Sequence, residues 1–326
     1  MNVLLWHVHG SWTTAFIQGR HRYLVPVLPE RGPDGRGRAD TYVWPDSAVE
    51  VSPEEAATAD VDVVVLQRPH ELEHLAERWL GGRRPGRDLP AVYLEHNTPQ
   101  GRIAEMRHPA ADRPELTVVH VTHFNRLFWD TGSTPVRVIE HGVVDPGHLY
   151  RGDLERAAAA INEPGRRGRV VGADLLGELS RTLPVDVFGI ATERDLPQRQ
   201  LHEELARRRV YVHPYRWTSL GLALIEAMHI GMPVVALATT EVPEAVPAGA
   251  GFVSNRLDVL HEGLRRLARN RALAQEMGAR AREHALRRYG LRRFLQDWDQ
   301  LLGDAVEGMS GARSVLESSP AAGRAR

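Results

Sequence analysis

One glutamate, Glu226, stands inside an otherwise apolar run, LALIEAM at residues 222–228. Thr218 and Ser219 before the run are helix-capping residue types, and a glycine and a proline just after it are typical helix stops. A carboxylate facing a protein core costs several kcal/mol unless it is paired. Glu226 therefore lies either on the solvent stripe of this helix or in a binding site.

The turn before this helix is small and contains Gly221. The first amides of a helix have no partners within it and attract anions. At about 1.5 Å rise per residue, Glu226 lies only about 7 Å along the axis from Gly221. This spacing suits a ligand with phosphates at the helix start and hydroxyls alongside it.

Composition bounds the class of protein. A chain of 326 residues is long enough for two ordinary domains. The net charge of −1 gives no argument for bulk binding to nucleic acid, and the absence of Cys excludes disulfides and thiolate sites. All basic residues are Arg, so a phosphate-binding cation must be an arginine. Without a long apolar run or a basic leader, the sequence predicts a cytoplasmic protein.

Short apolar runs alternate with helical patterns, which predicts an α/β fold. The strands are expected at residues 3–8, 23–28, 62–66, 91–94, 116–121, 157–161, 185–189, 210–212 and 234–237. Gly10 and Ser11 follow the first strand, where ligands gather in doubly wound sheets, although a plain tight turn would explain them equally. The Gly-, Pro- and Arg-rich stretch 30–40 is expected to be a solvent loop. Asp297 and Asp299 would point apart on a helix and cannot share a metal ion.

The run from Ser219 to Val235 resembles the nucleotide-sugar signature of the retaining glycosyltransferases of family 4. The resemblance extends more thinly over residues 1–307 and implies the GT-B architecture, two Rossmann-like doubly wound domains facing a cleft. It places an N-terminal acceptor-side domain at 1–150 and a nucleotide-sugar domain at 151–290. It also implies two further strands, at 136–139 and 249–253. A helix at 291–307 would cross back to the first domain. Residues 308–326, rich in Ser, Ala, Gly and Arg, are expected to be a disordered tail.

The resemblance also implies roles for individual residues. Glu226 would hold the ribose, and Arg167 would hold the donor diphosphate. A shift of the alignment would give this role to Arg166 or Arg169 instead. The plainer explanation of these arginines is a basic turn exposed to solvent. His96, after the strand at 91–94, would lie near the transferred sugar, although a histidine there is often a packing or capping residue. Neighbouring Glu95 is a weaker candidate. The other predicted donor-site residues are Gly10, Ser11, Gly189, Thr218, Ser219, Leu220, Gly221 and Leu222.

The chain departs from the family pattern at Thr218, where relatives have the first glutamate of an E-x7-E pair. Asn162 stands where the family has an arginine, and Thr239 and Thr240 where it has glycines. A short neutral side chain cannot pair two sugar hydroxyls as a carboxylate does. Thr218 therefore predicts an atypical donor or weak discrimination between sugars.

The leading hypothesis is metal-independent transfer of a sugar, with retention, from a nucleoside-diphosphate sugar to an acceptor hydroxyl. The nucleotide sugar is a co-substrate, and no cofactor or metal is expected. A non-catalytic paralogue that binds a nucleotide or glycan is the alternative that the departures favour. A nucleotide-sugar 2-epimerase is a third, with Glu95 and Glu244 as its only loose acid/base candidates. Neither nucleic acid nor a membrane span is expected, and peripheral membrane contact stays open.

Overall fold

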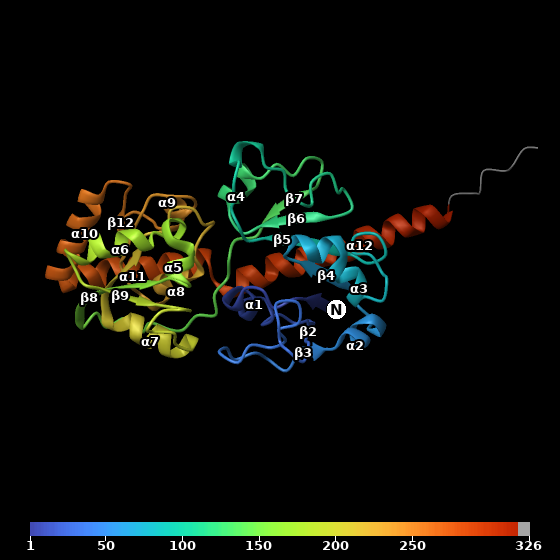
Figure 1. The fold of residues 1–326 in the computed structure, drawn as a ribbon, viewed down its shortest axis with the longest axis horizontal. Helices are drawn as coiled ribbons and strands as arrows, with labels where there is room; N and C mark the ends of the chain where they lie inside the picture. The colour runs from blue at the N-terminus through green and yellow to red at the C-terminus, as the bar shows by residue number, and fades with distance from the viewer. Residues whose placement is uncertain (319–326) are drawn as a thin grey trace, which may run out of the picture.

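The computed structural model describes residues 1–318, with side chains described as far as residue 310. Its first domain contains a parallel sheet in the order β3-β2-β1-β4-β5-β6-β7 (Figure 1). The strands are β1 Asn2–Leu5, β2 Arg22–Pro26, β3 Ala48–Val51, β4 Val63–Leu66, β5 Ala91–Glu95, β6 Thr117–His120 and β7 Val136–Val138. Central strands such as β4 are apolar and buried throughout because helices cover both faces of a parallel sheet.

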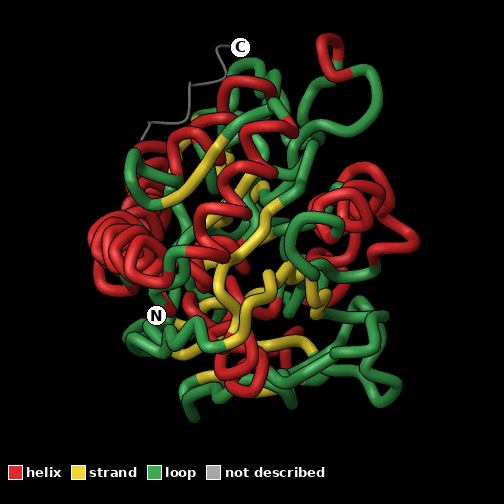
Figure 2. Tube along the Cα trace, turned by 90° about the vertical axis from the view of Figure 1, so that its left-hand side faces the viewer, coloured by secondary structure: helices red, strands yellow, loops and turns green. Residues whose placement is uncertain are grey.

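The helices of this domain are short. They are α1 Gly10–Phe16, α2 Pro53–Thr58, the π-helical turn η1 Glu71–Leu75, α3 Ala76–Trp79, the 3-10 turn η2 Ile103–Glu105 and α4 His123–Phe128. In the view from the side of the second domain, helices lie on both sides of the strands (Figure 2). The strand order reverses between β1 and β4, and a doubly wound sheet binds ligands outside the carboxyl ends of its strands at such a point.

The second domain has a parallel sheet in the order β12-β11-β10-β8-β9. Its strands are β8 Leu154–Ala160, β9 Val185–Phe188, β10 Arg208–His213, β11 Val234–Ala236 and β12 Gly251–Val253. The helical elements are α5 Pro164–Arg167, η3 Gly168–Val171, η4 Ala173–Leu175, α6 Leu176–Ser180, α7 Gln198–Arg207, α8 Leu222–Ile230, α9 Val242–Ala245, α10 Leu257–Arg269 and α11 Arg271–Arg288. The order reverses between β8 and β10, so the segments after these two strands border the second crevice.

The last helix, α12 Leu291–Ser318, returns to the first domain. Phe294, Trp298 and Leu302 are buried in one apolar cluster with Trp12 and Phe16 of α1. The helix extends past residue 307, where the sequence predicted its end, and the disorder expected from residue 308 onwards stays a prediction. The remainder of the predicted tail, residues 319–326, lies outside the described residues.

Two elements differ from the sequence-based expectations. Strand β3 was not predicted, because its run of four residues includes Glu50 and so lacks an apolar pattern. Thr218 and Ser219 do not cap α8, since its N-cap residue is Gly221, which has extended backbone angles. The space at Gly221 is tight: a Cβ atom there would lie 2.8 Å from His213 Cε1, which explains the glycine.

Candidate functional site

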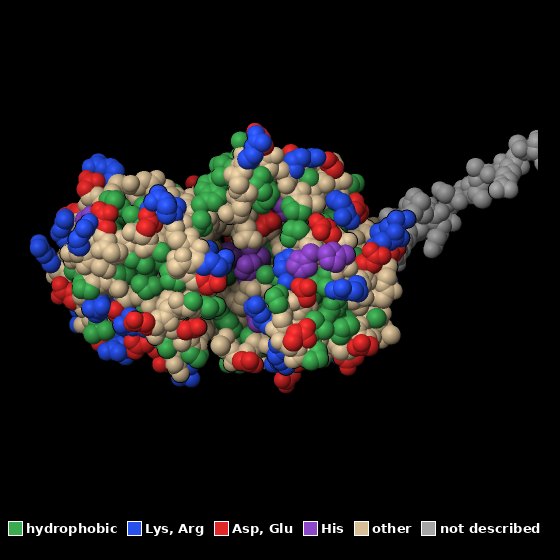
Figure 3. All heavy atoms as spheres, in the orientation of Figure 1, with side chains coloured by type: hydrophobic (Ala, Val, Ile, Leu, Met, Phe, Trp, Pro, Cys, Tyr) green, Lys and Arg blue, Asp and Glu red, His purple; other side chains and the backbone are tan. Residues whose placement is uncertain are grey.

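A cleft of about 1160 Å³ lies between the two domains. In the space-filling view it is the hollow at the centre of the molecule, where histidine and arginine side chains gather (Figure 3). The predicted site residues from both domains all line it: Gly10, Ser11, His96, Arg166, Arg167, Gly189, Thr218, Ser219, Leu220, Gly221, Leu222 and Glu226. Segments more than 200 residues apart in sequence thus meet in one place, while the role of each residue stays a prediction.

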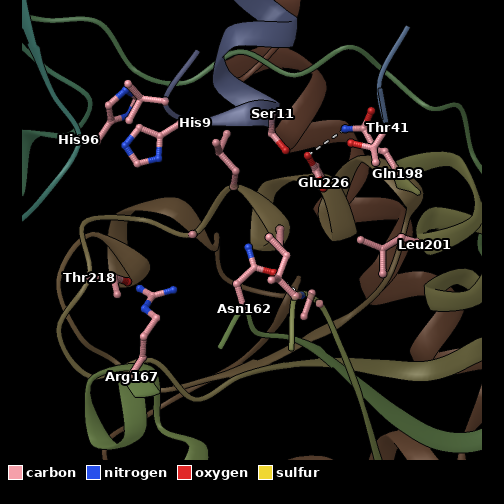
Figure 4. Close-up of a pocket in the computed structure, with 18 of the residues that line it drawn as sticks. His9, Ser11, Thr41, His96, Asn162, Arg167, Gln198, Leu201, Thr218 and Glu226 are labelled. Atoms are coloured by element: carbon pink, nitrogen blue, oxygen red, sulfur yellow. Dashed lines mark hydrogen bonds between the residues drawn. The ribbon is translucent and has the colours of Figure 1, made fainter. Parts of the chain in front are cut away.

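Glu226 faces the cleft from α8 and is only 4% exposed. Gln198 Nε2 donates to one carboxylate oxygen at 3.2 Å, and His202 Nε2 lies 3.2 Å from the other. Figure 4 shows Ser11 of the first domain and Gln198 of the second both pointing at this carboxylate. Burial alone would raise the pKa of Glu226, but these three polar partners outweigh it and hold the pKa below its ordinary value. The carboxylate is therefore kept ionised inside the protein.

Gln198 and His202 were not predicted from sequence. They lie four residues apart and so share one face of α7. The sequence signal that could have identified them is this spacing of two polar residues on a helix that packs next to α8. The solvent-stripe interpretation of Glu226 is wrong, because α8 is buried from Leu224 to Ile230.

Among the three candidate arginines, the structure distinguishes Arg167. Arg166 is bound to Glu163, with N–O distances of 2.9 and 2.5 Å, and Arg169 is paired with Asp174 at 3.0 Å and does not line the cleft. Arg167 points into the cleft (Figure 4), and its guanidinium has no ion-pair or hydrogen-bond partner among the described residues. Its guanidinium carbon lies 5.9 Å from the ring centroid of Tyr215. An arginine free of carboxylates is available to an anionic ligand.

The acceptor-side wall contains a cluster of histidines around His96. The His9 and His96 ring centroids are 3.9 Å apart, and His141 stacks on His96 at 6.3 Å. Gln67 Oε1 lies 3.2 Å from His96 Nε2, and since the Gln67 amide nitrogen donates to Trp6 O, His96 Nε2 is the donor in this pair. Burial lowers the pKa of all three histidines, to about 4 for His9, to about 3 for His141 and well below 6.5 for His96. The rings are neutral at pH 7.

This cluster makes stability depend on pH. The unfolded chain protonates His9 and His141 below pH 6.5, whereas the folded chain resists protonation down to about pH 4 and about pH 3. The free energy of unfolding should therefore fall as pH drops from 6.5 towards 4, by up to about 1.4 kcal/mol per pH unit for each histidine. We expect His141→Gln to flatten this slope in urea titrations followed by circular dichroism. The control is His123→Gln, at an exposed position, and an unchanged slope in His141→Gln would contradict the assignment.

The two other carboxylates considered as acid/base candidates, Glu95 and Glu244, do not line the cleft. Glu95 is buried, accepts from Asn97 N at 2.6 Å and faces His108 Nε2 at 3.1 Å, and it does not line the cleft. Its position at the end of β5 suggested a replacement for the missing glutamate, but the strand's alternation points it to the other side of the sheet from His96. Glu244 is exposed and also outside the cleft.

The stretch 30–40 is not the solvent loop that its composition predicted. Arg36, Arg38 and Asp40 line the cleft, followed by Tyr42, whose hydroxyl lies 3.2 Å from Ser11 Oγ. The Arg38 side chain holds the loop in place by donating to the backbone carbonyls of residues 44, 45 and 48. Hydrogen bonds from a side chain to the carbonyls of its own loop leave no pattern in the sequence.

The two domains are bonded at one end of the cleft. Trp217 Nε1 donates to Pro99 O at 2.9 Å, and Ser219 Oγ lies 3.0 Å from Thr122 Oγ1. Thr218 Oγ1 is buried and has no hydrogen-bond partner among the described residues. The segment before α8 thus contacts the acceptor-side domain, which explains why its hydroxyl residues do not cap the helix.

Two further observations concern ions and membranes. Asp297 pairs with Arg293 at 2.8 Å while Asp299 contacts Arg20 and His21 at 3.0 and 2.9 Å, so the two carboxylates diverge as expected. Within residues 1–318 there is no group of three or more potential metal ligands. The helices of the same part of the chain include none that is both long and apolar enough to span a bilayer.

Comparison with known proteins finds a family match over part of the chain. Residues 194–284, which include α7, α8 and the strands beside them, match the family described as Glycosyl transferases group 1. No curated protein matches the chain in sequence.

Solved structures share the fold. HepE of Anabaena, in complex with UDP, is 14% identical, with 93% of this chain and 99% of that chain covered at a TM-score of 0.65. Sucrose-phosphate synthase of Thermosynechococcus elongatus is 12% identical, with 98% and 100% covered and a TM-score of 0.66. TarM of S. aureus, in a complex that includes UDP, is 14% identical at a TM-score of 0.59, and the match covers 74% of this chain but only 55% of TarM. The chain therefore has the GT-B fold, and its residues 194–284 match the group 1 glycosyltransferases.

Proposed function

We propose that this protein transfers a sugar, with retention of configuration, from a UDP-sugar to an acceptor hydroxyl. The observation that carries the proposal is that an ionised, buried Glu226 and Arg167, which has no ion-pair partner among the described residues, face one cleft at the reversal point of the second sheet. Anionic and hydroxyl-rich ligands need these two groups in such a place. UDP is proposed because HepE and TarM hold it in their solved complexes.

Each part of the donor has a proposed partner. Arg167 and the first amides of α8 hold the diphosphate, and Glu226 accepts from a ribose hydroxyl with the lone pairs that Gln198 and His202 leave free. Gly189 lies at the end of β9 with a φ of 125°, where a Cβ atom would collide with Ile161 O, so a bare backbone surface is available beneath the base. His96 and the start of α1, at Gly10 and Ser11, face the sugar and the acceptor.

In the proposed step the bond from the anomeric carbon to the β-phosphate oxygen breaks. A bond to the acceptor oxygen forms on the same face of the sugar, and the departing diphosphate takes the acceptor's proton. Negative charge grows on the diphosphate, and Arg167 with the amides of α8 stabilises it without a divalent cation. The site offers no carboxylate at position 218, so hydroxyl recognition falls to the neutral Thr218 and to His96, with weak discrimination between sugars as the expected result.

The test is calorimetric titration of the protein with UDP, GDP, ADP and TDP. We expect UDP to bind at micromolar strength and Glu226→Ala to weaken it about tenfold to 150-fold, as for losing about 1.5–3 kcal/mol of charged hydrogen bonds. Glu244→Ala is the matched control, an exposed carboxylate in the same domain but outside the cleft, and it should bind UDP like the wild type.

If none of the four nucleotides binds the folded wild type, the donor site is wrong. The missing glutamate at Thr218 would then favour the non-catalytic alternative. Preferential binding of GDP, ADP or TDP would support the proposed donor site but show that the donor's base is not uracil.

A further inference from the structure

An exposed strip of apolar side chains leads out of the cleft at the end where the domains touch. We define the apolar strip as Val170, Trp217, Phe124, Phe128 and Leu127. Leu127 is 80% exposed, Phe128 37% and Val170 36%. Figure 3 shows hydrophobic side chains gathered over α4 on the side that faces the second domain.

The three rings of the strip pack against one another across the two domains, and Val170 is joined to Trp217 through the backbone. Val170 O accepts from Trp217 N at 3.1 Å. Trp217 meets the rings of Phe124 and Phe128 edge-on at 5.4 and 5.9 Å, and these two rings stack at 4.3 Å. Leu127 precedes Phe128 and is the more exposed of these two apolar residues of α4. Scattered exposed apolar residues are ordinary, but packed aromatic rings flanked by exposed apolar side chains are a feature of binding surfaces.

The inner end of the strip belongs to the cleft. Val170 and Trp217 both line it, and Trp217 immediately precedes Thr218 at the predicted sugar site. The hydrogen bond from Trp217 Nε1 to Pro99 O fixes the indole between the loop after β5 and the second domain. A ligand whose hydroxyl reaches the sugar can therefore lay its remaining part along the strip.

We propose that the acceptor carries an apolar group, an aromatic ring or alkyl chain, which binds on the apolar strip. This inference rests on the proposed function and specifies the acceptor class for the same cleft. A second protein is a poorer occupant, since standard protein interfaces take about 20–30 residues a side. Aromatic side chains in a fixed arrangement suit a ring or chain, because they bury large area with few rotamers to restrict.

The first experiment needs no donor and no turnover. The uncharged fluorescent probe N-phenyl-1-naphthylamine is titrated into the full chain and into Leu127→Ser/Phe128→Ser. We expect at least tenfold weaker binding in the double variant. The single variant Leu127→Ser alters only an exposed side chain, so it should fold even if the double variant is unstable. We expect it to bind the probe more weakly than the wild type, by a smaller factor than the double variant. The matched control Leu286→Ser changes an apolar residue of α11 that is 41% exposed and should leave probe binding unchanged.

The second experiment compares acceptors that differ only in the apolar group. Transfer from UDP-glucose to 4-nitrophenyl β-glucoside should have a KM at least tenfold lower than transfer to methyl β-glucoside. The double variant should lose this ratio while its UDP affinity stays unchanged, which separates failure of the strip from failure of the donor site.

Equal probe binding by wild type and both variants would overturn the proposal. It would also be overturned if phosphatidylcholine–phosphatidylglycerol vesicles bind the wild type and not Leu127→Ser, with the probe affinities equal. That result would assign the strip to a membrane surface.

Discussion

Replacing Arg167 by alanine is expected to lower kcat for sugar transfer by about 10²- to 10³-fold. The departing diphosphate gains charge as the glycosidic bond breaks, and a preorganised cation in a closed cleft stabilises that charge more than it stabilises the bound donor. Three arginines lie on the turn at 163–169 of the second domain. Arg166 and Arg169 are paired with carboxylates, whereas Arg167 has no carboxylate partner among the described residues and lines the cleft. The measurement is steady-state transfer from UDP-glucose, with donor binding followed separately by calorimetry.

Neighbouring arginines provide the controls for this prediction. Arg169→Ala removes the same charge from the same turn, but at a side chain that is paired with Asp174 outside the cleft, and it should cost less than about threefold. If Arg166→Ala rather than Arg167→Ala abolished transfer, the register of the diphosphate clamp would be shifted by one residue. If all three variants transferred sugar as fast as the wild type, the arginines of this turn would not bind the diphosphate.

Trp298→Ala is expected to destabilise the protein by about 3–5 kcal/mol. The indole is 1% exposed and its ring centroid lies 5.5 Å from Trp12 and 5.0 Å from Phe16, so truncation leaves a cavity between α12 and α1. Its Nε1 has no hydrogen-bond partner among the described residues, so the whole cost is a packing cost. Urea unfolding followed by circular dichroism measures it without relying on tryptophan fluorescence.

The control for this variant is Gln296→Ala, at an exposed position on the same helix. It should change the free energy of unfolding by less than about 0.5 kcal/mol. If both variants lost a similar amount of free energy of unfolding, the cost would come from any substitution in α12 and not from the contact of Trp298 with α1. Retained stability in Trp298→Ala would show that the helix is not part of the first domain's core.

The second domain was more predictable from sequence than the first because its signals are local. Glu226 in an apolar helix, Gly231 beyond it and the strands on either side all lie within 30 residues. Strands such as β4 and β11 are short β-branched runs, a pattern that propensity captures. The family resemblance then located the cleft residues in both domains.

Features set by distant contacts were not predictable. The loop at 30–42 reaches the cleft because Arg38 donates to the backbone carbonyls of residues 44, 45 and 48, and Ser219 faces Thr122, almost a hundred residues away. The end of α12 was misplaced because Gly303 and Gly308 weaken the helical pattern. In each case tertiary structure overrides the local preference of the segment.

The return of α12 to the first domain has a consequence for the order of folding during synthesis. Ribosomes release a chain from its N-terminus, and domains usually fold in that order. Here the apolar cluster around Trp12 and Phe16 is completed only by residues 294–302, near the other end of the chain. The first domain is thus synthesised first but finished last, and until α12 docks, its aromatic face is available to chaperones and to aggregation.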